Sequence, residues 1–186
     1  MYIVTWLVVV LGATQFAFAT DTVPELQFAR YVGRWYEVYA DRYSNMIHGK
    51  CMCALTDIGP RSNDSVTIQN FCRLKSPDGK LSTIKGYIIR PDDKEQGKLK
   101  LHLSGNPVGM NYWVIQLGPP TYNGSLYQYH VITDGSDRNM FVMVRNVTLF
   151  KEKFEATVLQ KLEQQGFNKS YNKPVAEYQG NDCQYP

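Results

Sequence analysis

The chain has 186 residues, of which 44% are hydrophobic and 20% are charged, and its formal net charge is +3. This is the composition of an ordinary globular protein, and the length suits one well-packed domain rather than two. The basic residues are scattered and form no Lys/Arg cluster, so we do not expect nucleic acid as a partner.

Residues 1–19 carry no charged side chain and have a long apolar centre. They end in Ala17-Phe18-Ala19, a small-x-small pattern that is typical of signal-peptidase cleavage. A membrane anchor is the alternative, but polar and small residues at positions 12, 14 and 15 interrupt the apolar run. No later segment is apolar enough to span a bilayer. We therefore predict a signal peptide over 1–19 and a secreted, extracellular domain over 20–186.

About a dozen residues into the predicted mature chain, a glycine and a tryptophan stand at the start of an aromatic and β-branched strand. Gly33 suits a tight turn or a close approach of the backbone. Trp35 brings a large apolar surface and a ring N–H that needs an acceptor. Seven more segments at hairpin spacing are typical of strands, separated by turn residues. The predicted strands cover residues 33–41, 50–58, 65–74, 81–90, 98–104, 111–117, 126–133 and 139–145.

The hydrophobic period changes to that of an amphipathic helix over 149–165. Thr148 is the predicted N-cap, and Gly166 is the predicted residue that ends the helix. A short extended tail then leads to Cys183. Four apolar side chains recur every four residues along this helix: Phe150, Phe154, Val158 and Leu162.

Eight successive antiparallel strands can close into an up-and-down barrel, which leaves no exposed sheet edge. The predicted fold class is therefore all-β, an eight-stranded antiparallel barrel with one C-terminal helix packed outside. An eight-stranded sandwich is the alternative. A barrel of this size can hold one small ligand at its centre.

The four cysteines predict two disulfides in a secreted chain, with three possible connectivities. A metal site is the rival interpretation, but the C-x-C spacing does not suit a zinc knuckle, and we predict no metal. Four N-x-S/T sequons lie in or beside predicted loops and element ends, where glycans can be carried. The cysteines are Cys51, Cys53, Cys72 and Cys183, and the sequons begin at Asn63, Asn123, Asn146 and Asn168.

From residue 23 to residue 183 the chain resembles a lipocalin, especially the branch of apolipoprotein D, the bilin-binding proteins and their bacterial outer-membrane relatives. GRWYEVY matches the first motif of that family at Gly33, Trp35 and Tyr36. SDRNMFVMVRN is similar to the segment of the third motif, with Arg145 as its arginine. Three further segments match this branch: HGKC ending at Cys51, YWVIQL at 112–117 and NDCQYP at the C-terminus.

The resemblance implies structural roles rather than catalytic ones for the motif residues. In lipocalins the motif tryptophan lies across the closed end of the barrel, so Arg145 is expected to pack over the ring of Trp35. Thr133-Asp134 looks like the second motif but lies at the wrong hairpin. The equivalent stretch, 117–122, departs from the family pattern.

The resemblance also implies that Cys51 pairs with Cys183 and ties the tail to the barrel. Cys53 and Cys72 are then left to pair across the hairpin. Exchanging Cys51 and Cys53 is the alternative.

An inward Arg145 and strand alternation together imply which side chains line a ligand pocket. The lining is mostly apolar with a few hydrogen-bonding tips, as small-ligand sites are. The alternative to ligand binding is that these residues only fill a hydrophobic core. The predicted ligand-binding residues are Ile68, Asn70, Ile84, Ile88, Leu99, Leu101, Leu103, Tyr112, Val114, Gln116, Phe141 and Met143.

The predicted function is a secreted carrier of a small hydrophobic ligand such as a fatty acid, sterol or retinoid. A lipocalin that binds a bilin or carotenoid is the first alternative, and a protein-binding, inhibitory lipocalin is an alternative of another class. We predict no enzyme, no required cofactor and no catalytic residue. An enzyme of the prostaglandin-isomerase type would need a free thiol, for which only Cys72 qualifies, and haem would need an axial ligand, for which His130 is a weak candidate.

Overall fold

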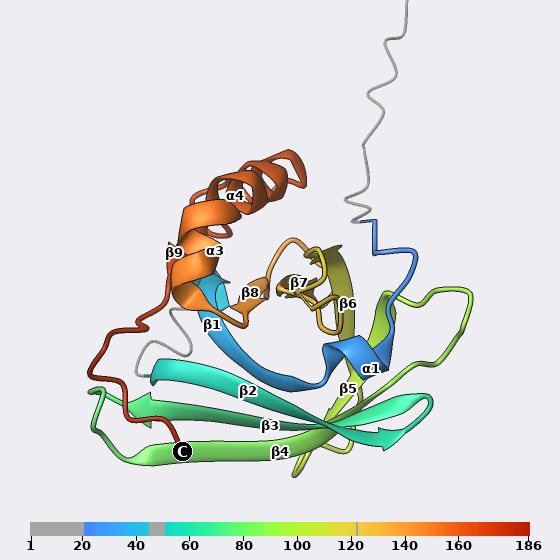
Figure 1. Cartoon of the computed structure of the whole chain (residues 1–186), viewed down its shortest axis with the longest axis horizontal. Coiled ribbons are helices and arrows are strands. Elements are labelled where there is room, and N and C mark those ends of the chain that lie inside the picture. Colours follow the sequence, from blue (N-terminus) through green and yellow to red (C-terminus); the bar gives the residue numbers. More distant parts are fainter. Residues whose placement is uncertain (1–20, 45–50, 122) are drawn as a thin grey trace, which may run out of the picture.

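The structure is a computed structural model that describes residues 21–44, 51–121 and 123–186. The predicted signal peptide and the predicted start of the second strand at Lys50 lie outside the described residues. Within the described residues, the chain forms one antiparallel barrel followed by a helical segment and a short ninth strand (Figure 1).

The barrel closes because β1 pairs with β8 on one side and with β2 on the other. Every other strand pairs with its neighbour in the chain, which is the up-and-down arrangement that the hairpin spacing predicts. The eight barrel strands are β1 (Gly33–Asp41), β2 (Cys51–Ser62), β3 (Ser65–Leu74), β4 (Leu81–Ile89), β5 (Lys98–Leu103), β6 (Met110–Leu117), β7 (Tyr129–Thr133) and β8 (Phe141–Val144).

The C-terminal helical segment packs outside the barrel, on the wall formed by β1, β6, β7 and β8 (Figure 1). It consists of α3 (Val147–Lys153) and α4 (Glu155–Gln164). The predicted single helix is thus divided at Phe154, whose backbone leaves helical geometry although helical hydrogen bonds continue on both sides of it. The N-cap is Asn146 rather than the predicted Thr148, because the Asn146 side chain accepts the N–H of Leu149.

Further differences from the prediction lie in the turn after residue 58, in the lead-in and in the tail, and strands β7 and β8 are shorter than predicted. The turn cluster after residue 58 is largely strand, since β2 continues through Pro60 to Ser62 and leaves a two-residue turn. A register shift between Pro60 and Ser62 accommodates the proline, which has no N–H to donate. The lead-in contains a one-turn helix, α1 (Phe28–Tyr31), and the tail adds β9 (Pro174–Ala176) beside β1.

The disulfides are Cys51–Cys72 and Cys53–Cys183, so the pairing implied by the resemblance is wrong and its alternative is correct. Cys51 lies in register with Leu74, which places it on the same face as Cys72, two residues away on β3. Cys53 lies at a register shift of β2 with φ of 55°, and its N–H donates to the carbonyl of Tyr178 in the tail. This bulge turns Cys53 toward the tail rather than toward β3.

The two disulfides are expected to contribute unequally to stability, because they close loops of very different length. The Cys53–Cys183 bridge spans 130 residues and the Cys51–Cys72 bridge spans 21. In the chain-entropy description, replacing the first pair by serine costs about 5 kcal/mol and replacing the second costs about 3 kcal/mol. Urea unfolding of the two double-serine variants measures the difference. Equal losses, or a larger loss from the short loop, would contradict the prediction.

Candidate functional site

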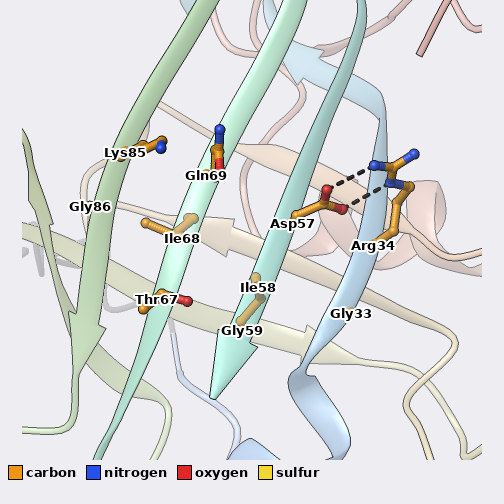
Figure 2. Close-up of a pocket in the computed structure, with 10 residues that line it drawn as sticks. All are labelled: Gly33, Arg34, Asp57, Ile58, Gly59, Thr67, Ile68, Gln69, Lys85 and Gly86. Carbon is orange, nitrogen blue, oxygen red and sulfur yellow. Dashed lines mark hydrogen bonds and ion pairs between the residues drawn. The ribbon is translucent and has the colours of Figure 1, made fainter. Parts of the chain in front are cut away.

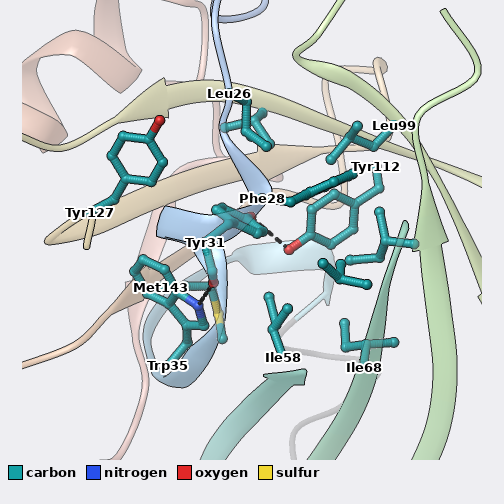
Figure 3. Close-up of a cluster of buried hydrophobic side chains, with 13 residues drawn as sticks. Leu26, Phe28, Tyr31, Trp35, Ile58, Ile68, Leu99, Tyr112, Tyr127 and Met143 are labelled. Carbon is teal, nitrogen blue, oxygen red and sulfur yellow. Dashed lines mark hydrogen bonds between the residues drawn. The ribbon is translucent and has the colours of Figure 1, made fainter. Parts of the chain in front are cut away.

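The closed end of the barrel is sealed around Trp35 (Figure 3). Its ring is fully buried, and its Nε1–H donates to the carbonyl oxygen of Tyr31 at 2.8 Å. The guanidinium carbon of Arg145 lies 3.9 Å from the centre of the Trp35 ring, the contact that the resemblance implied. A cation over the face of an indole ring is attracted to it electrostatically, and the attraction is stronger here because the Trp35 ring is buried.

Arg145 also holds several backbone carbonyls at this end. Its Nε–H donates to Tyr127 at 2.7 Å, and its Nη2–H donates to Val32 at 2.7 Å and to Arg30 at 3.2 Å. The side chain therefore joins the lead-in, β1 and the loop before β7. Burial lowers the pKa of Arg145 to about 10, so the guanidinium stays charged at neutral pH.

The buried cluster around Trp35 at the closed end, called the floor below, contains a few polar side chains that contact one another. The hydroxyls of Tyr31 and Tyr112 are 3.0 Å apart, and the Tyr112 hydroxyl is 3.4 Å from Nε2 of His130 (Figure 3 shows the two tyrosines). His130 is 1% exposed, and its ring packs edge-on against Trp35 with centroids 4.3 Å apart. Burial lowers the pKa of His130 well below its usual value, and the Arg145 charge adds to this shift. His130 is therefore a neutral residue of the floor.

Nine of the twelve predicted lining residues belong to this inner side of the barrel. Six are buried in the cluster around Trp35: Ile68, Ile88, Leu99, Tyr112, Val114 and Met143. Leu101, Leu103 and Phe141 pack against the same cluster but keep accessible surface. The inner side is thus filled toward the closed end and accessible toward the open end.

Two more predicted residues lie on β3 and β4 near the open end. Asn70 is half-buried, and its side-chain oxygen accepts the hydroxyl of Thr56 at 2.9 Å. Ile84, opposite Asn70 in register, is 40% exposed. The structure leaves both beside the accessible part of the inner side rather than in the packed floor.

Gln116 does not face the interior, and its predicted place in the lining is wrong. It is 2% exposed because it lies under α4, where its Nε2–H donates to the side chain of Gln165 at 2.9 Å. A register shift between Val114 and Gln116 places Ile115 and Gln116 both on the helix side, and Leu117 returns to the inner cluster. This bulge breaks the alternation from which the prediction was made.

Sequence reasoning missed the inward carboxyl of Glu37. It lies opposite Met143 across the β1–β8 pair, so its side chain shares the inner side with Met143. Burial raises the pKa of Glu37 to about 8, and the nearby negative charge of Glu177 adds to this shift. The signal was present in strand alternation, since Glu37 follows the inward Trp35 by two residues.

A hollow of about 370 Å³ lies beside the outer side of β1–β4 (Figure 2). Its wall carries a row of side chains that point away from the core: Arg34, Asp57, Gln69 and Lys85. Arg34 and Asp57 form a two-armed ion pair, with Nη2 2.8 Å from Oδ2 and Nε 2.9 Å from Oδ1. Of the twelve predicted ligand-binding residues, only Ile68 is among those that line this hollow.

The side-chain chemistry of the described residues offers no thiol nucleophile, since all four cysteines are in disulfides. Cys72, the candidate for an isomerase thiol, is bonded to Cys51. No group of three or more His, Cys, Asp or Glu side chains is placed to hold a metal ion among these residues. Across the same part of the chain, no helix combines the length and apolar character needed to cross a bilayer.

All four sequon asparagines are exposed. Asn63 lies in the β2–β3 turn and Asn123 in the loop before β7, whereas Asn146 caps α3 and Asn168 follows α4. Their glycosylation remains a prediction.

The backbone conformation at position 33 and the closeness of Arg145 explain why a glycine precedes Trp35. Its φ is +105°, and a Cβ built there would lie 2.8 Å from Nη1 of Arg145. Gly105 is a matched control, since its φ is +86° but no atom lies within 4 Å of a Cβ there. We expect Gly105→Ala to cost about 1 kcal/mol and Gly33→Ala to cost about 2–4 kcal/mol, because only the second change also displaces Arg145. Denaturant unfolding measures both, and equal losses would refute the role of this contact.

The raised pKa of Glu37 makes the free energy of unfolding depend on pH. Because its pKa is raised on folding, the folded state binds this proton more tightly than the unfolded state, and the contribution is lost as pH rises through 8. From pH 7 to 8.5 the free energy of unfolding should fall by up to about 1 kcal/mol. His130 adds little in this range, since its lowered pKa destabilises the fold mainly below pH 6.5.

The test compares Glu37→Gln with Glu155→Gln, a carboxyl on the outer helix that accepts from Tyr39. The pH-dependent loss should disappear in the first variant and persist in the second. An unchanged slope in Glu37→Gln would assign the loss to other groups.

The comparisons with known proteins agree with this geometry. The family model described as a lipocalin-like domain matches residues 26–176. A comparison with curated protein sequences gives no significant match.

Several solved structures share the fold at low sequence identity. Insecticyanin from the tobacco hornworm Manduca sexta is 14% identical, with 89% of this chain and 88% of that chain covered and a TM-score of 0.59. Lobster apocrustacyanin A1 is 15% identical, with 83% and 80% covered and a TM-score of 0.55. Japanin from Rhipicephalus appendiculatus, in a structure bound to cholesterol, is 14% identical, with 88% and 100% covered and a TM-score of 0.53. With a closed eight-stranded barrel, an outer helix and a family match over most of its length, the chain belongs to the lipocalin family.

Proposed function

We propose that this protein is a secreted carrier that binds a small hydrophobic ligand, such as a fatty acid, sterol or retinoid, inside the barrel. The proposal depends on the difference in burial between the two ends of the barrel interior. Inward residues near the closed end are buried against Trp35, whereas the inward Leu101, Leu103 and Phe141 keep accessible surface. Apolar side chains turned into a barrel and still accessible provide a surface that an apolar ligand would cover.

Because one end of the barrel is closed, a ligand would reach this surface through the open end. The lead-in crosses the floor and is fixed there, since the N–H of Val23 donates to Val114 and the N–H of Leu26 donates to the side chain of Gln96. Burying about 200–300 Å² of apolar ligand surface contributes roughly 5–8 kcal/mol before the costs of association are subtracted. This apolar contribution corresponds to a Kd between about 0.2 mM and about 1 μM, so the expected affinity from apolar burial alone is micromolar or weaker.

Two observations support the secreted and ligand-binding parts of the proposal. Both disulfides suit an oxidising compartment. The related structure of Japanin is bound to cholesterol, which is a hydrophobic ligand in a protein of the same fold. At 14% identity this likeness supports the class of ligand and no particular compound.

The first experiment is native mass spectrometry of the protein from its own source, with an absorbance spectrum of the same sample. An added small mass without visible absorption supports a lipid carrier. An added mass with visible absorption supports the pigment-binding alternative. The absence of any added mass, together with no binding of any lipid tested, would refute the carrier and favour a protein-binding lipocalin.

Neighbouring residues on β5 provide a matched pair of variants for locating the ligand. Leu101 faces the inner side, while Lys100 faces outward and its Nζ donates to Asn111 at 2.7 Å. Leu101→Gln should weaken binding of a neutral fluorescent apolar probe by about ten-fold, because it places an amide on the apolar surface. Lys100→Gln should leave binding within about two-fold. Equal effects in a titration of probe fluorescence would place the probe outside the barrel.

A further inference from the structure

Glu37 places a carboxyl group at the level where the filled floor gives way to the accessible half of the barrel. Two residues before it, Trp35 is part of the floor, and three residues after it, Ala40 pairs with Phe141 on the open side. Its cross-strand neighbour Met143 is the last floor residue on β8 before that side. A ligand resting on the floor would therefore meet this carboxyl.

The cations on the inner side at the closed end are already engaged elsewhere. Arg145 donates to backbone carbonyls, and Arg90 donates from Nη2 to the carbonyl of Leu26 while its guanidinium lies 4.7 Å from the Phe28 ring centre. Among the described residues, no hydrogen bond or ion pair engages the Glu37 carboxyl. By contrast, Asp57 on the outer side is paired with Arg34 at 2.8 Å.

The backbone that presents Glu37 is fixed from two directions. A register shift in β1 immediately follows it, and the Nε2–H groups of Gln179 donate to the carbonyls of Glu37 and Ala54 at 2.7 Å each. Gln179 lies in the tail that the Cys53–Cys183 disulfide anchors. The backbone at Glu37 is thus fixed without a ligand, so only the side chain has to be ordered when a ligand binds.

The chemistry of this position favours one kind of head group. An ionised carboxylate that is largely removed from water is costly unless a cation accompanies it. A ligand ammonium group supplies that cation and donates hydrogen bonds to both carboxylate oxygens. Without a ligand, burial raises the pKa of the Glu37 carboxyl to about 8, so an ammonium group that binds there at pH 7 stabilises the carboxylate and releases its proton to the solvent. A ligand carboxylate would instead bring a negative charge beside that of Glu177 and would oppose the ionisation of Glu37.

We infer that the preferred ligand of the barrel is a hydrophobic amine, with its ammonium group on the Glu37 carboxylate and its apolar part against Leu101, Leu103 and Phe141 toward the open end. Glu37 is then the residue that determines specificity for the head group. This inference rests on the proposed function, since it assumes that the barrel binds an apolar ligand.

The test uses competition between ligands that share one chain and differ in charge. Dodecylamine, dodecanol and dodecanoate, each below its aggregation concentration, displace N-phenyl-1-naphthylamine from the purified protein at pH 7. In the unaltered protein we expect dodecylamine to compete at about ten-fold lower concentration than dodecanoate, with dodecanol between them. In Glu37→Gln, the amine should lose about ten-fold in affinity while dodecanol changes by less than about two-fold.

Two controls separate selectivity from loss of fold. Glu155→Gln removes a carboxyl from the outer helix and should keep the order of the three competitors. Binding of dodecanol by Glu37→Gln shows that the variant retains a folded barrel.

The failures are distinguishable. If dodecanol displaces the probe but dodecanoate competes as well as dodecylamine, or if Glu37→Gln leaves the amine affinity unchanged, the inference about Glu37 is overturned and the carrier stands. If the probe does not bind the unaltered protein at all and none of the three compounds binds, the proposed carrier function itself is overturned.

Discussion

The structure depends on the contact between Arg145 and Trp35 at the closed end of the barrel. One guanidinium covers the indole ring and donates to carbonyls of the lead-in, of β1 and of the loop before β7. Backbone carbonyls that come from three separate segments would otherwise be left unsatisfied where water has limited access. Because this single side chain meets that need, the lead-in can cross the end of the barrel and seal it.

Sealing one end decides what the remainder of the interior can do. Trp35, Tyr31 and His130 pack ring against ring, and the hydroxyl of Tyr112 completes the polar contacts of the group. A floor packed in this way leaves the accessible apolar surface at the opposite end, where strand β5 carries leucines at alternate positions. The same side chains therefore serve as core near the floor and as a binding surface above it, according to their depth.

Bulges determine which face of the barrel wall each side chain occupies. The shift after Glu37 in β1 places Val38 and Tyr39 under the outer helices, and the shift in β6 does the same for Ile115 and Gln116. A third shift, in β2, directs Cys53 to the tail. Each bulge adds one residue to a strand, so that every later side chain exchanges faces relative to strict alternation.

The sequence by itself determined the barrel, its strand order and its outer helix, because hydrophobic period and turn residues are local properties that a chain displays before it folds. The roles of Gly33, Trp35 and Arg145 came instead from the resemblance of their segments to lipocalin motifs. The tertiary structure decided the disulfide partners of Cys51 and Cys53 and the outward position of Gln116. These depend on where a strand gains one residue relative to its neighbour. That register is set by packing between segments distant in sequence, as between Cys53 and the tail.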